Sequence, residues 1–404
     1  MTALIGIAVL PLIAFALSSN RQAVNLRTVG LALGIQVTIG GMALHTEWGI
    51  ATLQSMSQGV TALLGYSRDG IEFLFGGVVT SDAVGFVFAF AVLPVVVFFS
   101  SFIAVLYHLG VMQWLIRILG GGLRRALGTS HTESLSAAAN IFVGQSEAPL
   151  VVRPYIPGMT ISELFAVMVG GMASIAGSVM AGYVALGVPI EYLLAASFMA
   201  APGGLLMAKL MEPETGAPVS PTELRAVNTE EYVNVIDAAA SGASSGLRMA
   251  ANIGAMLVAF VALIALVNGL LGYFGGWFGV EDITLQGILG AVFQPVAWVL
   301  GVPWEQAHLA GSLIGQKLIL NEFVAYVAYA DIMGQFDTVS QAIVVFALCG
   351  FANLSSIAIL AGGLGAIAPT RRSDISRYGL RAVVAATLSN LMSAAIAGLF
   401  LSLS

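Results

Sequence analysis

Charged residues are scarce in this chain. Only 9% of the 404 residues are Asp, Glu, Lys or Arg, whereas 58% are hydrophobic and the mean hydropathy is +0.94. A soluble domain usually carries about 25% charged residues, so this composition excludes a globular surface that faces water. It predicts an all-α polytopic membrane protein, because helices satisfy their own backbone hydrogen bonds in lipid.

Cysteine and histidine are also scarce. The single Cys349 excludes a disulfide framework and Cys-x-x-Cys metal sites. The four histidines share no metal-ligand spacing; they are His45, His108, His131 and His308. The net charge of −6 is small and scattered, so nothing indicates a nucleic-acid partner. No Lys or Arg precedes the first apolar run and no clear cleavage site follows it, so we expect a retained helix rather than a signal peptide.

Long apolar runs, in contrast, are abundant. About 20 residues cross a bilayer, and eight runs are long enough: 3–19, 28–45, 82–107, 162–187, 190–210, 250–273, 338–364 and 378–403. Residues 48–66 and 110–128 mix polar and apolar residues at helical spacing, which predicts interfacial helices. Residues 284–301 are expected to be a third such segment, because Pro295 should break them.

Basic residues fall on one side of a topology with eight spans, and only Arg68 is expected in a loop on the other side. By the positive-inside rule the basic side is cytoplasmic and both termini point outward. The polar stretch 212–237 is expected to be a cytoplasmic loop between two membrane halves. The basic residues that define this side are Arg21, Arg27, Arg117, Arg124, Arg125, Lys209, Arg225, Arg248, Arg371, Arg372, Arg377 and Arg381.

Two segments carry polar residues where a simple span does not fit. Residues 132–156 contain GQSEAP, and residues 305–332 contain Lys317 and Asn321-Glu322. Each segment predicts two half-helices that form a re-entrant hairpin, whose tip has to line a cavity or be buried in protein. An ionisable residue at this depth is costly, so Glu147 and Glu322 are candidate substrate-facing groups.

The two predicted hairpins occur in matching contexts. Each follows a spanning and an interfacial helix and precedes two spanning helices, and Ser-Ile-Ala recurs at 174–176 and 356–358. The first hairpin is expected to enter from inside and the second from outside, which is the inverted repeat of a secondary transporter. The predicted organisation is scaffold helices at 1–81, a first repeat at 82–211, a cytoplasmic loop and linker at 212–249, and a second repeat at 250–404.

Three motifs, GQSEAPLVVRPYI (144–156), LNEFVAY (320–326) and GFANLSSI (350–357), closely resemble those of the concentrative nucleoside transporters. The resemblance covers nearly the whole chain. It implies a homotrimer in the bacterial cytoplasmic (inner) membrane, in which each protomer pairs a scaffold with a mobile, elevator-like transport domain. It also implies import of nucleosides such as uridine, cytidine and adenosine with Na+ as the coupling ion, and leaves the preference for purines or pyrimidines open.

The same resemblance implies roles for particular residues. Those facing the nucleobase are Gln145, Ser146 and Glu147, with Val179 nearby. Those facing the ribose are Glu322, Asn353 and Ser356, with Phe351 lining the same pocket. Those holding sodium are Asn140, Val143, Ser174 and Ile175. These roles suit the chemistry, because a carboxylate accepts hydroxyl donors with charge-assisted strength.

Several alternatives remain open. Glu147 or Glu322 would carry a proton in place of sodium if burial favoured the protonated carboxyl group. Structural ion pairs with Arg153 and Lys317 are the non-functional alternatives for the two glutamates. An intramembrane enzyme lacks support, since the chain has no GxSxG, HExxH or paired-aspartate motif. A cation channel lined by both carboxylates is a third class, although paired hairpin tips favour occlusion.

Overall fold

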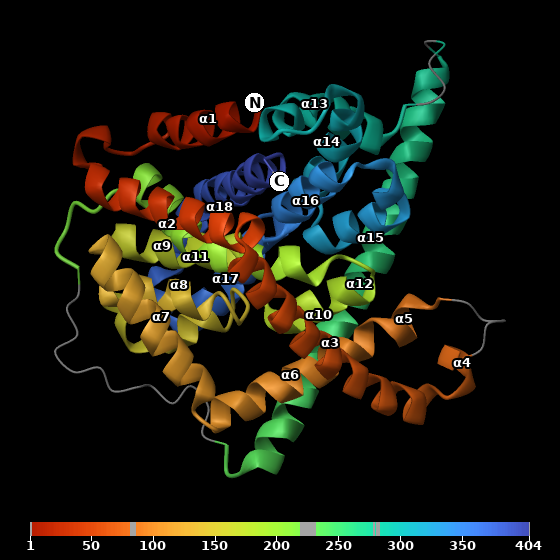
Figure 1. Ribbon diagram of the computed structural model, residues 1–404, viewed down its shortest axis with the longest axis horizontal. Helices are drawn as coiled ribbons and strands as arrows, with labels where there is room; N and C mark the ends of the chain where they lie inside the picture. Colours follow the sequence, from red (N-terminus) through yellow and green to blue (C-terminus); the bar gives the residue numbers. More distant parts are fainter. Residues whose placement is uncertain (1, 81–85, 219–231, 278, 280–282, 404) are drawn as a thin grey trace.

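The computed structural model describes residues 2–80, 86–218, 232–277, 279 and 283–403. Every regular element in these residues is a helix, which confirms the predicted all-α class. Figure 1 shows the long helix α12 (Val235–Gly276) along one edge of the molecule and the two termini close together. Arg225 and the start of the predicted run 82–107 lie outside the described residues.

Six helical segments of the described chain are long and apolar enough to cross a membrane, which makes this a multi-pass membrane protein. They overlap six of the eight predicted runs and comprise Leu26–His45, Phe88–His108, Ile161–Ala185, Ile190–Met211, Val235–Gly276 and Pro369–Leu401. The other two predicted runs form the shorter helices α1 (Thr2–Ala16), α16 (Thr338–Leu348) and α17 (Ser355–Ile367). The count of eight spans therefore stays a prediction.

The long apolar helices differ in burial. In α11 (Ile190–Met211), 94% of the apolar stretch is buried inside the molecule, and α18 (Arg372–Leu401) is similarly enclosed. In α12 only 17% is buried, and α2 (Leu26–His45) and α6 (Leu93–His108) are also largely exposed. The fold thus has an enclosed inner group of helices and an outer group whose apolar faces are free for lipid or another chain.

Small residues let the outer helices α6 and α12 approach closely. Gly242 and Gly246 lie one turn apart on α12, and a Cβ on Gly246 would come within 2.8 Å of Ser100 and Val97 of α6. Ser101 Oγ of α6 also donates a hydrogen bond to the carbonyl oxygen of Ala239, at 2.9 Å. This is the small-xxx-small pattern by which membrane helices pack without a hydrophobic driving force.

A Gly246→Val variant is expected to lower the free energy of unfolding by about 1–3 kcal/mol, because its side chain overpacks the α6–α12 contact. The matched control is Gly269→Val on the same helix, where nothing lies within 4 Å of an added Cβ. The measurement is the midpoint of thermal unfolding in detergent. Equal midpoints for the two variants would show that the close packing of α6 on α12 does not stabilise the fold.

The first predicted hairpin consists of α8 (His131–Ala139), a tip at 140–147 and the 3-10 helix η2 (Ala148–Gly158). Pro149, Pro154 and Pro157 lack the N–H that an α-helix would use, which explains the tighter second arm. The second hairpin consists of α14 (Trp304–Ile319), a tip at 320–321 and α15 (Glu322–Ile332). Both predicted pairs of half-helices are present, and their re-entry into the membrane as hairpins stays a prediction.

Capping residues anchor the base of the first hairpin. Ser130 with Glu133 begins α8, and Thr160 with Glu163 begins α9 (Ile161–Ala173), each as a reciprocal capping box. Lys209 of α11 forms a buried ion pair with Glu133. Because these groups satisfy one another, the two helix starts and α11 are fixed together at one end of the inner group.

Each hairpin is tied, at or near its tip, to an interruption in the helix pair that follows it. In the first repeat, α9 is separated from α10 (Gly177–Ala185) by residues 174–176, and Gly177 N donates to Phe142 O at 2.9 Å. In the second repeat, α16 is separated from α17 by residues 349–354, and Leu354 N donates to Leu318 O at 3.1 Å. We call these two interruptions the helix breaks. The parallel connections agree with a structural repeat.

The Ser-Ile-Ala triplets do not occupy equivalent places. Residues 174–176 form the first helix break, whereas 356–358 lie inside the first turn of α17. In the predicted repeat, the segment that occupies the place of 174–176 is 349–354, whose sequence differs, so the short match between the triplets does not support the repeat.

Three local expectations were wrong. Pro295 was expected to break its segment, but it lies inside the continuous helix α13 (Leu285–Leu300). This helix packs closely against α14, since a Cβ on Gly311 of α14 would lie 2.7 Å from the backbone at Phe293. Arg68 lies in helix α3 (Glu47–Phe75) rather than a loop, where it pairs with Glu72 at 2.7 Å. Helix α12 begins at Val235, so the second part of the expected linker 212–249 is helical.

Candidate functional site

Both hairpin tips and both helix breaks meet at a cavity of about 420 Å³, which we call the tip cavity. This volume is within the range of about 300–1,000 Å³ that is usual for small-molecule sites. Helix α12 closes one side of the cavity through residues from Ser245 to Leu257. Seven of the eight predicted substrate residues line it: Gln145, Ser146, Val179, Glu322, Phe351, Asn353 and Ser356.

A buried carboxylate is held in a fixed orientation at this cavity. Glu322 is the first residue of α15 and is 5% exposed. Its Oε1 accepts a hydrogen bond from Tyr183 Oη at 3.1 Å, and its Oε2 accepts one from Asn353 Nδ2 at 2.9 Å. The N-terminus of a helix favours negative charge. The remaining lone pairs of Glu322 can therefore accept hydroxyl groups from a ligand.

Asn353 is itself oriented by the second helix break. Its Oδ1 accepts from Ser356 N at 2.9 Å and from Ser355 Oγ at 2.6 Å, which leaves Nδ2 directed to Glu322. These bonds fix the amide so that it donates to the carboxylate. The predicted ribose side of the site is therefore a connected set of polar groups rather than separate side chains.

The tip of the first hairpin reaches this set through Gln145. Its Nε2 donates to Ser356 Oγ at 3.1 Å, and Ser356 Oγ donates to Phe351 O at 2.6 Å. Gln145 Oε1 is buried and has no hydrogen-bond partner among the described residues. A buried acceptor without a partner is uncommon in folded proteins, so this oxygen is available to an N–H or O–H donor on a ligand.

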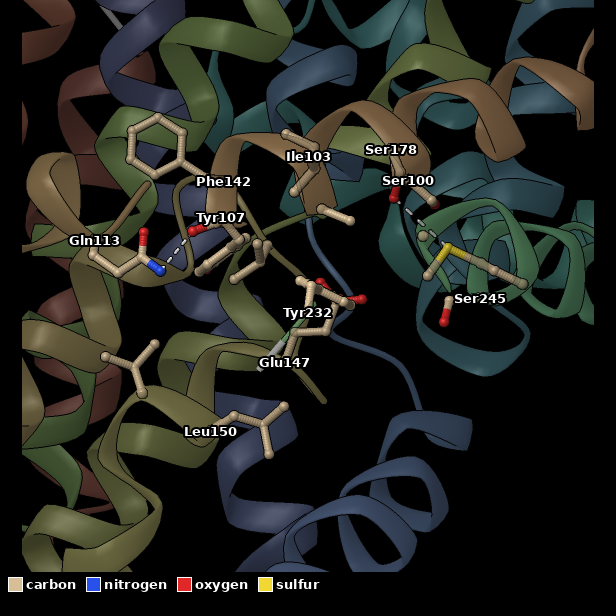
Figure 2. A pocket seen from close by; sticks show the side chains of 15 residues that line it. Ser100, Ile103, Tyr107, Gln113, Phe142, Glu147, Leu150, Ser178, Tyr232 and Ser245 are labelled. Carbon is tan, nitrogen blue, oxygen red and sulfur yellow. Dashed lines mark hydrogen bonds between the residues drawn. The ribbon is translucent and has the colours of Figure 1, made fainter. Parts of the chain in front are cut away.

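Glu147 is the exception among the predicted substrate residues. It lines a second cavity of about 130 Å³ with Tyr107, Gln113 and Leu150, which we call the side cavity (Figure 2). The backbone turns tightly here, because both Glu147 N and Ala148 N donate to Gly144 O at 3.0 Å. The turn directs Glu147 away from the cavity lined by Gln145, and the sequence pattern alone did not reveal this separation.

The predicted sodium residues lie together beside the first helix break. Asn140 is the C-cap of α8, and its buried Oδ1 has no hydrogen-bond partner among the described residues. Ser174 Oγ donates to Gly170 O at 3.1 Å, and a Cβ on Gly170 would lie 3.2 Å from Asn140 Nδ2. Val143 and Ile175 are buried next to these residues in sequence. An unpaired oxygen at the C-terminal end of a helix suits a cation.

Carboxylates and imidazoles play no part in this predicted ion site. In the described chain, no group of three or more His, Cys, Asp or Glu is placed to hold a metal ion. The oxygens that the four predicted residues themselves offer are those of the Asn140 amide, the Ser174 hydroxyl and the backbone. Neutral oxygens of this kind suit a monovalent hard cation better than a transition metal.

Sequence reasoning missed one wall of the tip cavity and the partner of Glu322. On α12, Arg248 and Asn252 face the cavity, and a polar residue in an otherwise apolar helix was the available signal. Tyr183 lies on α10 and is fully buried against Glu322. Nothing in its sequence context distinguishes Tyr183 from a packing tyrosine.

The proposed structural partner of Glu322 is engaged elsewhere. Lys317 Nζ donates to Ala347 O at 2.9 Å and to Asn390 Oδ1 at 2.6 Å. The ion pairs within 4.0 Å in the described chain do not include Lys317 with Glu322. Glu322 therefore accepts its side-chain hydrogen bonds from neutral donors and lines the cavity, and Lys317 acts on it only electrostatically, without an ion-pair contact.

Three family models match separate parts of the chain. The one described as "Na+ dependent nucleoside transporter N-terminus" matches residues 5–78, and "Na+ dependent nucleoside transporter C-terminus" matches residues 192–398. Between them, residues 89–189 match "Nucleoside recognition", a gate domain. The three matches together span most of the chain and follow one another in order.

Relatives and solved structures agree with these matches. An uncharacterized transporter of Haemophilus influenzae is 55% identical over 100% of this chain and 98% of its own length. The nucleoside permease NupC of Helicobacter pylori is 48% identical over 99% of this chain and 97% of its own length. The structure of CNTnw in an inward-facing substrate-bound state is 56% identical, with a TM-score of 0.96 over 100% of this chain and 98% of that one. These are transporters rather than enzymes, and the chain belongs to the concentrative, Na+-dependent nucleoside transporter family.

Proposed function

We propose that the protein is a sodium-coupled symporter that imports nucleosides across the cytoplasmic membrane of a bacterial cell. The observation that carries this proposal is the tip cavity, where Glu322 is oriented by Tyr183 and Asn353. Seven of the eight residues that the family resemblance assigns to substrate converge there from elements far apart in the sequence. A nucleoside such as uridine, cytidine or adenosine fits this combination of polar and apolar groups.

The two sides of the cavity suit the two halves of a nucleoside. Ribose hydroxyls donate, and the Glu322 carboxylate accepts them with charge-assisted strength. The unpaired Oε1 of Gln145 accepts an N–H from the base edge, and Ser146 offers a hydroxyl beside it. Phe351 and Val179 supply apolar surface for the base. Purines and pyrimidines both present such groups, so the substrate range is an outcome for experiment.

Sodium binding near Asn140 gives a physical basis for coupling. The proposed ion would take oxygens from Asn140, Ser174 and the backbone at Val143 and Ile175. Ser174 O accepts a hydrogen bond from Phe351 N at 3.1 Å, so the first helix break contacts the second directly. An ion that orders the first break also orders the wall of the tip cavity. Sodium and nucleoside then each raise the affinity for the other.

The division into inner and outer helices supports an elevator-type movement. The hairpins and the enclosed helices α9, α11 and α18 would form the mobile part, and α2, α6 and α12 the scaffold. We also propose a homotrimer, as the family resemblance implies, and the apolar outer helices offer faces for self-association. Mass measurement of the protein in nanodiscs tests this state; a monomeric mass would contradict it.

Uptake of labelled uridine, cytidine and adenosine into proteoliposomes tests the proposed function. Accumulation is expected with an inward sodium gradient and not when potassium replaces sodium at the same pH. Accumulation that follows a proton gradient without sodium would contradict sodium coupling and transfer the coupling role to a carboxylate. No accumulation under any gradient, with protein shown to be folded, would remove the nucleoside assignment.

A further inference from the structure

Lys317 is a buried cation that nucleoside binding does not use. It lies near the end of α14, is 2% exposed, and donates only to neutral oxygens, those of Ala347 and Asn390. In the described chain it has no carboxylate within 4.0 Å. Burying an ammonium group is costly even where a carboxylate such as Glu322 interacts with it electrostatically without direct contact, so its presence in this position calls for a specific role.

Asn390 of α18 extends this contact to both helix breaks. Its Nδ2 donates to Ala173 O at 2.6 Å and to Cys349 O at 2.9 Å, while its Oδ1 accepts from Lys317. Ala173 is the last residue of α9, and Cys349 is the C-cap of α16. One amide therefore satisfies carbonyl groups at the ends of two different helices.

Gly350 leaves the space that this arrangement needs. Its φ is +159°, and a Cβ at this position would overlap the Asn390 amide. A glycine is therefore required wherever Asn390 reaches both carbonyl groups. Lys317, Asn390 and Gly350 together form what we call the break-bridging cluster.

Lys317 lies where the second hairpin meets the second helix break. The residue after it, Leu318, accepts a hydrogen bond through its carbonyl oxygen from the N-cap residue of α17. The ammonium group of Lys317 lies beside the end of α16, and the C-terminal end of a helix favours a cation.

We propose that Lys317, together with Asn390, holds the two helix breaks in register and thereby sets the coupling between sodium and nucleoside. This inference rests on the proposed function, since it assumes a sodium ion at Asn140. Lys317 is then a positioning residue: it contacts neither ligand but sets the spacing through which one ligand affects the other.

A short chain of contacts leads from the bridged breaks to the substrate. Asn390 holds Ala173, and the neighbouring Ser174 O accepts from Phe351 N at 3.1 Å. Phe351 O accepts from Ser356 Oγ, which in turn accepts from Gln145 Nε2. Displacement of the first break relative to the second therefore changes the position of Gln145 and Phe351 in the tip cavity. Each step is a direct hydrogen bond rather than mere proximity.

The test measures a coupling factor, which is the uridine Kd without sodium divided by the uridine Kd at saturating sodium. Both Kd values are measured by calorimetry on the purified full-length protein. In Lys317→Met, we expect this factor to fall by at least about fivefold, since site–site coupling typically amounts to 5–150-fold. The matched control is Lys209→Met, another buried lysine, which pairs with Glu133 far from the breaks. It is expected to lower the midpoint of thermal unfolding and to keep the coupling factor.

A further variant guards against a folding defect. Asn390→Ser keeps a hydroxyl oxygen for Lys317 but cannot reach both carbonyl groups, and it is expected to reduce the coupling factor as well.

The outcomes separate the two proposals. A wild-type protein whose uridine affinity ignores sodium would overturn the proposed coupling ion. Wild-type coupling that survives within twofold in folded Lys317→Met, or that falls equally in Lys209→Met, would overturn the positioning role alone.

Discussion

Glu322→Gln is expected to weaken uridine binding by roughly 10- to 100-fold, because hydrogen bonds to a charged group contribute about 1.5–3 kcal/mol. The substitution keeps the size of the side chain and removes the charge that accepts ribose hydroxyls. It also places an amide N–H₂ against Tyr183 or Asn353, both of which donate to this position. Uridine Kd at saturating sodium is the measurement.

Two companion variants show whether the loss belongs to the tip cavity. Tyr183→Phe removes one donor to Glu322 without changing the carboxylate, so a smaller loss of a few-fold is expected. Glu147→Gln changes a carboxylate that lines the side cavity, and its effect on uridine Kd is expected to be weaker than that of Glu322→Gln. Equal losses at Glu147 and Glu322 would show that the two cavities do not act separately on the substrate.

Asn140→Ala is expected to raise the sodium concentration for half-maximal uridine uptake by at least about tenfold. One lost ligand to a buried cation costs at least as much as one charge-assisted hydrogen bond, about 1.5–3 kcal/mol. Uptake at very high sodium is expected to recover, because the tip cavity keeps its own residues. Ser174→Ala is expected to act in the same direction, since its hydroxyl lies at the same helix break.

Ser178→Ala is the matched control for these two variants. Ser178 lies four residues after Ser174 on α10, and its hydroxyl contacts the sulfur of Met249 at 3.7 Å. Its removal is expected to leave the sodium requirement unchanged. Sodium stimulation that persists unaltered in both Asn140→Ala and Ser174→Ala would place the ion elsewhere in the molecule.

Local signals in the sequence predicted the pieces of the fold but not their junctions. The apolar runs, the two hairpins and the polar tips follow from periodicity and from the cost of polar groups in lipid. The predicted helix break at Pro295 was wrong, because a proline removes only one hydrogen bond and the packing of α13 against α14 outweighs that loss. The predicted loop at Arg68 was wrong, because a charged residue does not end a helix when an i,i+4 partner such as Glu72 supports it.

The candidate site was predictable where the chain signals a helix break and obscure where contacts are tertiary. Gln145, Asn353 and Glu322 stand out as polar residues in apolar surroundings, and all three line the tip cavity. Glu147 is also a polar residue in apolar surroundings, but a tight backbone turn directs it into the side cavity, and no composition rule predicts that turn. Asn390 appears in the sequence as one amide in a spanning helix, and its double contact exists only once α18 crosses both breaks.

The tip cavity and the side cavity share Ser245 and Met249 on α12. Methionine is unbranched and changes conformation easily, so the boundary between the two compartments is soft. If the nucleoside binds in the tip cavity as proposed, a derivative with a slender substituent directed at Met249 is expected to reach the side cavity beside Tyr107 and Gln113. The molecule thus offers medicinal chemistry a route to inhibitors that keep the sugar and base of the natural cargo and gain selectivity from a neighbouring compartment.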